Sequence, residues 1–360
     1  MKKPLLYLLT ILALLGCKHE PTGREQLLQR LQSLQEKGCM FGHQDDPFYG
    51  IGWAYENGRS DVLETCGDWP AVMGFDLGGI EMGDSKNLDS VPFDCIRKEI
   101  IRHHQRGGII TVSWHPRNPM TVSQSQGAPW PDGTAWDAQN GVVTAILPDG
   151  EKHEMFKQWL DRVRTFLLAL QDENGQPVPF IFRPWHENNG GWFWWGAPHC
   201  SAAEFRALYA LTQDYINLPN ILWSYSPNLD GAMTEERFLK RYPGDERVDL
   251  IGLDAYQWGT EEDFIRQTRV DLDCFCRFGH EHHKLVALTE CGYRSVPDPT
   301  WWTRVLLPIV EDYPLSYALV WRNAEKGEHF GPVPDTEGAR DFQAFHNSSR
   351  TLFLQNIIHN

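Results

Sequence analysis

Eight short apolar runs recur along the chain, and each has the length of a buried β-strand. They are rich in Val, Ile, Leu, Phe and Trp, and they lack the strict alternation of apolar and polar residues that marks a half-exposed strand. The pattern therefore predicts strands that are buried on both faces. The eight runs are Gly38–Phe41, Ala71–Phe75, Ile109–Trp114, Phe180–Pro184, Ile221–Tyr225, Leu250–Leu253, Leu285–Leu288 and Tyr317–Trp321.

Most of these runs are separated by segments whose apolar residues recur with the spacing of an amphipathic helix. Such segments include Arg24–Lys37, Cys95–Arg106, Glu154–Gln171, Ala202–Ile216, Glu261–Phe278 and Trp301–Glu311. Alternation of strand and helix predicts a parallel sheet, and eight repeats close into a (β/α)8 barrel, the α/β fold also called a TIM barrel. No linker, low-complexity block or internal repeat divides residues 24–360, so we expect a single domain.

Polar side chains follow the predicted strands, at or just after the last residue of each run. Because the carboxyl ends of the strands form one rim of a barrel, and active sites lie at that rim, these residues are expected to converge. They are His43, Asp76, His115, His186, Glu187, Asn228, Asp254, Tyr256, Glu290, Arg322 and Asn323.

The N-terminus has the features of a secretory signal peptide. A charged start, Met1–Lys3, precedes an apolar run, Pro4–Leu15, that is too short to cross a bilayer of about 30 Å as a helix. Leu14–Cys17 resembles the bacterial lipobox, which predicts cleavage after residue 16, lipidation of Cys17 and a tether over residues 17–23. An ordinary signal peptide with an incidental cysteine is the alternative. We expect a protein outside the cytoplasm, in the periplasm or at the cell surface, that contacts the membrane through its lipid anchor only.

Composition narrows the possible partners. The formal net charge of −15 argues against nucleic acid as a partner, because binding nucleic acid requires a basic face.

Seven cysteines lie beyond Cys17, and because this number is odd their pairing is left open. A His-Glu-His-His run at 280–283 is more typical of a solvated helix end than of a metal site, so we expect no metal and no cofactor. The 15 tryptophans suggest flat faces on which sugars stack, and we expect a monomer.

Two glutamates end predicted strands on opposite sides of the barrel mouth. Glu187 ends the fourth strand, beside His186 and before a Trp-rich loop, and Glu290 ends the seventh strand. Hydrolysis of a glycosidic bond needs one carboxyl group as proton donor and another as nucleophile or base. A separation of about 5–5.5 Å implies retention of configuration, and about 6.5–9.5 Å implies inversion. The pair predicts a glycoside hydrolase and leaves the stereochemistry open.

The motifs around these glutamates resemble glycoside hydrolase family 26. The resemblance covers most of the chain, roughly residues 27–353, and its most specific part is the block of fourteen residues from Arg183 to Gly196. It implies a (β/α)8 barrel and a retaining enzyme, most often an endo-β-1,4-mannanase. The segments that carry it are Trp114–Pro116, Arg183–Gly196, Asp254–Tyr256, Thr289–Glu290 and Trp321–Arg322.

The resemblance also implies roles for individual residues. Glu187 corresponds to the acid/base and Glu290 to the nucleophile, while Tyr256 would orient Glu290. His186 would hydrogen-bond the nucleophile or the sugar, and Asp254 would hydrogen-bond within the same shell. The other sugar-contacting positions implied are His115, Trp136, Trp192, Trp321 and Arg322.

Three alternatives to an endo-mannanase remain open. The long loop 124–153, which follows the third strand, would make the enzyme exo-acting and mannobiose-releasing if it walls one end of the cleft. The same scaffold would also suit β-1,3-xylan or mixed-linkage β-glucan. A surface glycan-binding protein is the non-enzymatic alternative, and the presence of both Glu187 and Glu290 argues against it.

Overall fold

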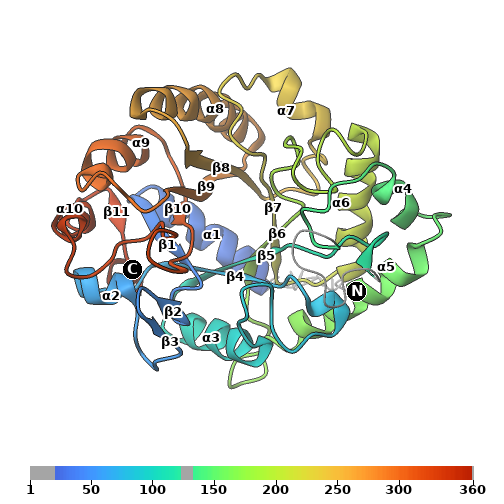
Figure 1. Ribbon diagram of the computed structural model, residues 1–360, viewed down its shortest axis with the longest axis horizontal. Helices are drawn as coiled ribbons and strands as arrows, with labels where there is room; N and C mark the ends of the chain where they lie inside the picture. The colour runs from blue at the N-terminus through green and yellow to red at the C-terminus, as the bar shows by residue number, and fades with distance from the viewer. Residues whose placement is uncertain (1–20, 123–132, 359–360) are drawn as a thin grey trace, which may run out of the picture.

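Eight parallel strands form a closed ring at the centre of the molecule (Figure 1). This computed structural model describes residues 21–122 and 133–358. Pairing of β1 with β10 closes the ring and confirms the predicted (β/α)8 barrel. The ring strands are β1 (Cys39–Gln44), β4 (Val72–Asp76), β5 (Ile109–Trp114), β6 (Phe180–Pro184), β7 (Ile221–Tyr225), β8 (Leu250–Gln257), β9 (Leu285–Tyr293) and β10 (Tyr317–Val320).

The strands differ from the prediction mainly at their carboxyl ends. β8 and β9 extend several residues past their apolar runs, and their register shifts between Leu253 and Asp254. Beyond the shift, Asp254 lies opposite Glu290, so the irregular pairing places two acidic residues side by side. Three short strands had no apolar run to reveal them: β2 (Tyr49–Gly50), β3 (Trp53–Ala54) and β11 (Thr351–Leu352).

Helices surround the barrel and connect its strands. The segment predicted as one helix over Trp301–Glu311 is a π-helical turn, Trp302–Leu306, followed by α9. Pro308 lacks the N–H that a continuous α-helix would use there, which accounts for the change. The helices are α1 (Gly23–Gln35), α2 (Asp61–Cys66), α3 (Phe93–Gln105), α4 (Val142–Ile146), α5 (His153–Leu168), α6 (Ala202–Ile216), α7 (Glu235–Arg241), α8 (Glu261–His282), α9 (Leu307–Asp312), α10 (Glu337–His346), α11 (Leu354–Ile358) and the 3-10 turn Ile80–Met82.

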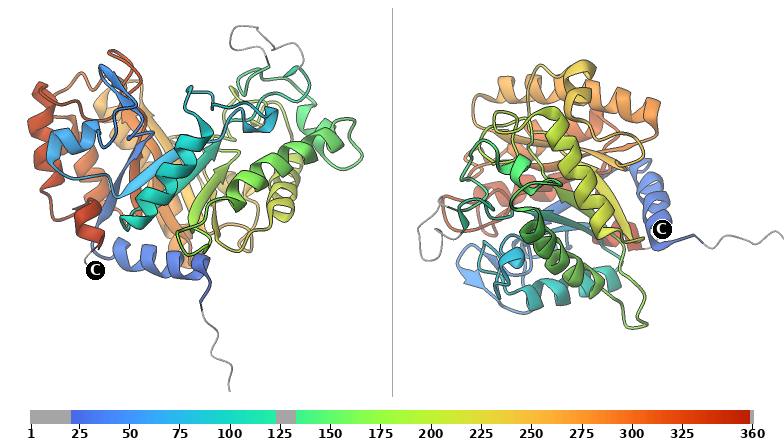
Figure 2. Two further views of the ribbon diagram at one scale, coloured as in Figure 1. Left: turned by 90° about the horizontal axis from the view of Figure 1, so that it is seen from below. Right: turned by 90° about the vertical axis from the view of Figure 1, so that its right-hand side faces the viewer.

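The amino end of the barrel is sealed by α1. Figure 2 shows this helix lying across one end of the ring, away from the loops that follow the strands. Leu27, Leu31 and Leu34 share one face of α1 and pack against the first residues of the strands, including Val72 and Ile181. The opposite end of the barrel is therefore the one that is open to a ligand.

The expected signal peptide and Cys17 lie outside the described residues, as do residues 17–20 of the expected tether. Helix α1 begins at Gly23, one residue before the expected start of the barrel. All seven cysteines in the described ranges are free thiols. Across residues 21–122 and 133–358, no helix has both the length and the apolar character needed to cross a membrane.

Candidate active site

The chain leaves β6 in an unusual backbone conformation that places Glu187 at the barrel mouth. Trp185 and Glu187 have φ angles of 58° and 52°, in the left-handed region that costs a residue other than glycine about 1–3 kcal/mol. Two contacts hold this turn. The Glu187 N–H donates to the carbonyl of Ser226 at 2.7 Å, and the Trp185 indole donates to the Thr212 hydroxyl at 3.1 Å.

Most tryptophans near this turn are core residues. The rings of Trp185, Trp194 and Trp195 pack edge to face, with centroids 5.1–5.4 Å apart, and all three are buried, as is the neighbouring Trp114. Burial of these rings supplies the packing energy that holds the strained turn. The tryptophan excess therefore reflects the support beneath the site as much as the surface on which a sugar would stack.

The Glu187 carboxyl group lies in a largely dry environment. Its Oε2 accepts a hydrogen bond from the Trp192 indole at 2.6 Å, and the residue is only 9% exposed. Burial, and next the negative charges of Glu290 and Asp254, raise the pKa of Glu187 well above its usual value. This carboxyl group is therefore suited to hold a proton near neutral pH.

The Glu290 carboxyl group is instead held by strong donors. Oε1 forms an ion pair with the Arg183 guanidinium, and Oε2 accepts from the Tyr256 hydroxyl at 2.6 Å. The same guanidinium donates to Asp254 Oδ2 at 2.9 Å, and Thr289 donates to the other Asp254 oxygen at 2.6 Å. The Arg183 and Tyr256 donors fix the orientation of the Glu290 carboxyl group, as a nucleophile requires.

Arg183 and Asp254 form the base of the site. Both are buried, and burial raises the pKa of Asp254 to about 8 although Arg183 opposes the rise. The two acidic residues raise the pKa of Arg183 despite its burial, so the guanidinium stays charged. A buried cation between two carboxyl groups fixes both of them in place, because any other arrangement leaves a charge unpaired.

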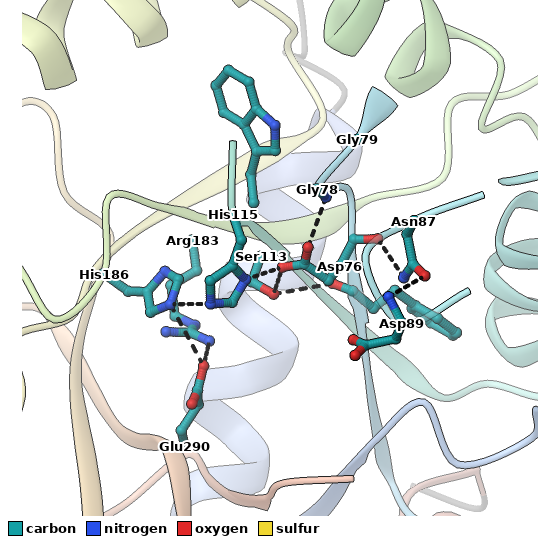
Figure 3. Close-up of polar contacts among 12 residues, drawn as sticks. Asp76, Gly78, Gly79, Asn87, Asp89, Ser113, His115, Arg183, His186 and Glu290 are labelled. Carbon is teal, nitrogen blue, oxygen red and sulfur yellow. Dashed lines mark hydrogen bonds and ion pairs between the residues drawn. The ribbon is translucent and has the colours of Figure 1, made fainter. Parts of the chain in front are cut away.

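A chain of hydrogen bonds runs from Asp76 to the nucleophile side of the site (Figure 3). Asp76 accepts from His115 Nδ1 at 2.6 Å, and His115 Nε2 lies 2.9 Å from Nε2 of His186. Burial lowers the pKa of His115, but the charge and hydrogen bond of Asp76 outweigh it and the net pKa is raised. Burial and the charge of Arg183 lower the pKa of His186 well below its usual value. These opposite pKa shifts favour His115 as the donor and His186 as the acceptor in this contact.

A hydrogen bond from His186 to the sugar stays a prediction, whereas the structure joins His186 to His115. Nε2 of His186 lies 3.9 Å from Glu290 Oε1, beyond hydrogen-bonding distance, because His115 occupies that nitrogen. His186 thus shields one side of Glu290 and orients His115, without a direct hydrogen bond to the nucleophile.

A cavity of about 630 Å³ lies on the His115 side of the barrel mouth, and neither Glu187 nor Glu290 lines it. Four of the expected sugar-contacting residues line it: His115, Trp136, Trp321 and Arg322. The Trp136 ring stacks on His115, with centroids 5.3 Å apart and planes 10° from parallel. Trp192 does not line this cavity, because it contacts Glu187 on the other side. Arg322 is held by Asp89 at 3.1 Å.

The described part of loop 124–153 forms one wall of this cavity. Thr134, Ala135 and Trp136 line it, and the base of the loop is closed by hydrogen bonds from Asn118 to the carbonyls of Gly133 and Asp137. Residues 124–132 of this loop lie outside the described residues.

Three rim residues hold loops instead of lining the cavity. His43 pairs with Asp46 at 2.6 Å, and the Asn228 N–H donates to Asn189 at 2.7 Å. Asn323 donates to Asp61 at 2.8 Å. The predicted convergence at one rim thus combines reacting groups with the framework that supports them.

The 280–283 run also has a structural explanation, since the His282 ring stacks on Phe278. The residues that the structure describes contain no group of three or more potential ligands arranged for a metal.

Arg183 was not expected from the sequence as a site residue, and Asp76 was expected at the rim but without its bond to His115. Arg183 lies inside the fourth apolar run, and a charged residue within a fully buried strand has to be paired, which was a usable signal. Asp76 ends the strand beside β5, so its proximity to His115 follows from strand order.

The sequence matches the family model for Glycosyl hydrolase family 26 over residues 19–299. A family 26 β-mannanase from Bacteroides ovatus is 42% identical, with a TM-score of 0.88 over 93% of this chain and 96% of that chain. An endo-β-1,4-mannanase from Cellulomonas fimi is 31% identical, with a TM-score of 0.81 over 93% of this chain and 76% of that chain.

A mannan endo-1,4-β-mannosidase from Bifidobacterium adolescentis is 30% identical over 91% of this chain. Another, from Thermothelomyces thermophilus, is 29% identical over 76% of this chain. The chain spans 34% and 51%, respectively, of the lengths of these two curated relatives. The family model covers well over half of the chain, and the chain therefore belongs to glycosyl hydrolase family 26.

Proposed function

We propose that the protein is a retaining endo-β-1,4-mannanase. The observation that carries this proposal is the contrast between two facing glutamates. Glu187 has a pKa raised well above its usual value by burial, whereas the Glu290 carboxyl group is held in place by contacts with Arg183 and Tyr256. One proton donor and one carboxylate are what hydrolysis of a glycosidic bond requires, and the retaining course is proposed from membership of family 26.

In the first step, Glu290 attacks the anomeric carbon of the sugar. The bond from that carbon to Glu290 forms as the glycosidic C–O bond breaks, and Glu187 transfers its proton to the departing oxygen. Tyr256 and Arg183 fix the attacking carboxylate so that little reorganisation is needed.

In the second step, Glu187 acts as a base toward water. Once Glu290 is esterified, its negative charge no longer raises the pKa of Glu187, so the ionised form becomes favourable. Glu187 takes a proton from water, the water oxygen bonds to the anomeric carbon, and Glu290 leaves as a carboxylate. The proton lost in the first step is thereby restored.

The assignment of mannan rests on the relatives. The Bacteroides ovatus and Cellulomonas fimi structures and the two curated relatives are all described as mannan-cleaving enzymes. We favour endo action because most of these descriptions specify it. The loop that carries Trp136 against the cavity supports the second possibility, an exo-acting enzyme that releases mannobiose. β-1,3-Xylan and mixed-linkage β-glucan are the other substrates considered.

The first experiment is chromatography of the products released by the mature enzyme. β-Mannan, β-1,3-xylan and mixed-linkage β-glucan are supplied separately. Mixed manno-oligosaccharides from mannan alone are the expected result. Mannobiose from the earliest time point would establish exo action, and products from xylan or glucan would overturn the substrate. No product from any of the three would favour a glycan-binding protein.

We also propose export and lipid anchoring through Cys17, with the protein in the periplasm or at the cell surface. The support is the lipobox-like Leu14–Cys17 after an apolar run. A Cys17→Ser variant is expected to leave the membrane fraction, and recovery of as much protein there as in the wild type would overturn the anchor. We expect a monomer.

A further inference from the structure

Trp258 is the most exposed large apolar side chain among the described residues, at 72%. It follows the last residue of β8, and its backbone is anchored on both sides. Gln257 is buried and accepts a hydrogen bond from the Trp301 indole at 2.8 Å, and Thr260 caps the N-terminus of α8 through the Asp263 N–H. A rigid backbone that presents a large aromatic ring to water is unusual unless the ring has a ligand.

The position of Trp258 relative to the cavity is set by the order of the strands. The cavity is lined by Gly78 and Gly79 after β4, and by residues that follow β5 and β10. Counted around the eight-stranded ring, β8 lies four strands from β4 in either direction. Trp258 therefore stands on the side of the mouth opposite the cavity, and the two glutamates lie between them.

Contacts connect Trp258 to the reacting groups. Its ring lies 5.7 Å from that of Tyr256, which donates to Glu290. Trp192, which donates to Glu187, follows β6, two strands from β8. The acid/base must lie beside the glycosidic oxygen, so the sugar that departs lies on the side of Trp192. The side of the mouth opposite the cavity, where Trp258 lies, then belongs to the leaving group.

We propose that Trp258 is a sugar-stacking platform for the part of the polysaccharide that departs from the cleavage point. This inference rests on the proposed function and deepens it. The ring offers its flat apolar face to the C–H face of a sugar. Because the ring is already exposed, no loop has to be ordered before the sugar binds. Short substrates that end at the cleavage point do not reach Trp258, whereas long chains do.

The test compares a long and a short substrate in the Trp258→Ala variant. The ratio of kcat/KM for β-1,4-mannohexaose to that for an aryl β-mannobioside is measured. In the aryl β-mannobioside the aryl group takes the place of the leaving sugar, and the substrate does not extend beyond it. We expect the ratio to fall about tenfold, the usual scale for truncating an aromatic anchor, mainly through KM. Trp258→Phe is expected to restore most of it.

Tyr55→Ala is the matched control. Tyr55 is 51% exposed, but it lines a separate cavity with residues of α3, so the ratio is expected to stay at the wild-type value. A wild-type enzyme that cleaves mannan and a Trp258→Ala variant with an unaltered ratio would overturn the inference and leave the proposed function intact. A wild-type protein inert on both substrates would overturn both.

Discussion

Glu187 and Glu290 are the same residue type at equivalent ends of two strands, but their surroundings are opposite. Glu290 is contacted by a guanidinium and a phenol, and both donate hydrogen bonds to its carboxyl group. Glu187 accepts from the Trp192 indole and lies where burial and neighbouring acidic groups favour its neutral form. Environment, and not residue type, thus divides the chemistry between the two carboxyl groups.

The two regions also differ in what holds them together. The Glu290 region depends on buried charges, Arg183 with Asp254 and Glu290, and such an arrangement contributes little net stability. The Glu187 region depends on packed indole rings beneath a strained turn. The charged cluster is therefore best explained by function, whereas the aromatic cluster serves the fold and the site together.

The largest expected effect is that of Glu290→Ala. Removal of the nucleophile abolishes formation of the covalent intermediate, so kcat should fall by at least about 10⁴-fold. The loss should be similar for mannan and for an aryl β-mannobioside, because both need the same nucleophile. Initial-rate measurements on both substrates, with circular dichroism to verify folding, test this. Retention of more than about 1% of wild-type kcat would show that another group attacks.

Glu187→Ala should give a smaller loss that depends on the leaving group. General acid catalysis contributes about 10²–10⁴-fold, and a phenolate that is a good leaving group needs little of it. The decrease should thus be large for mannan and much smaller for bond cleavage in an activated aryl mannobioside, seen as a burst of the phenol. Equal losses on the two substrates would remove the distinction drawn between Glu187 and Glu290.

The barrel was predictable from the sequence because its signal is local and repeated. Each strand is buried on both faces and so forms a largely apolar run, and all eight runs correspond to strands. Glu187 and Glu290 could be placed at one rim for the same reason. Polar residues that directly follow a buried strand have few positions open to them besides the rim.

What the sequence left hidden depends on pairing across the barrel. The His115 bond that removes His186 from Glu290 joins two side chains on neighbouring strands, and nothing in their spacing specifies which nitrogen meets which. The register shift that brings Asp254 beside Glu290 also leaves no local trace. Trp258 is exposed whereas Trp194 is buried, and this difference follows from packing and not from residue type.

The smallest effect expected is on pH dependence, in Trp192→Phe. The Trp192 indole donates to the Glu187 carboxylate and so lowers its pKa; without that donor the pKa of Glu187 rises further. Activity requires the protonated acid and falls as pH rises through its pKa, so the alkaline limb of the profile should move to higher pH. A hydrogen bond to a charged group contributes about 1.5–3 kcal/mol, which corresponds to a shift of about one pH unit or more.

The measurement is kcat/KM against pH, which reports groups of the free enzyme. Trp258→Phe provides the control, because its indole is not bonded to Glu187 and its alkaline limb should stay in place. A limb that moves to lower pH in Trp192→Phe would mean that loss of the indole admits water to Glu187, since solvation favours the carboxylate. In that case Trp192 would act on Glu187 mainly by excluding water, and not through its hydrogen bond, and this would be its part in the difference between the two glutamates.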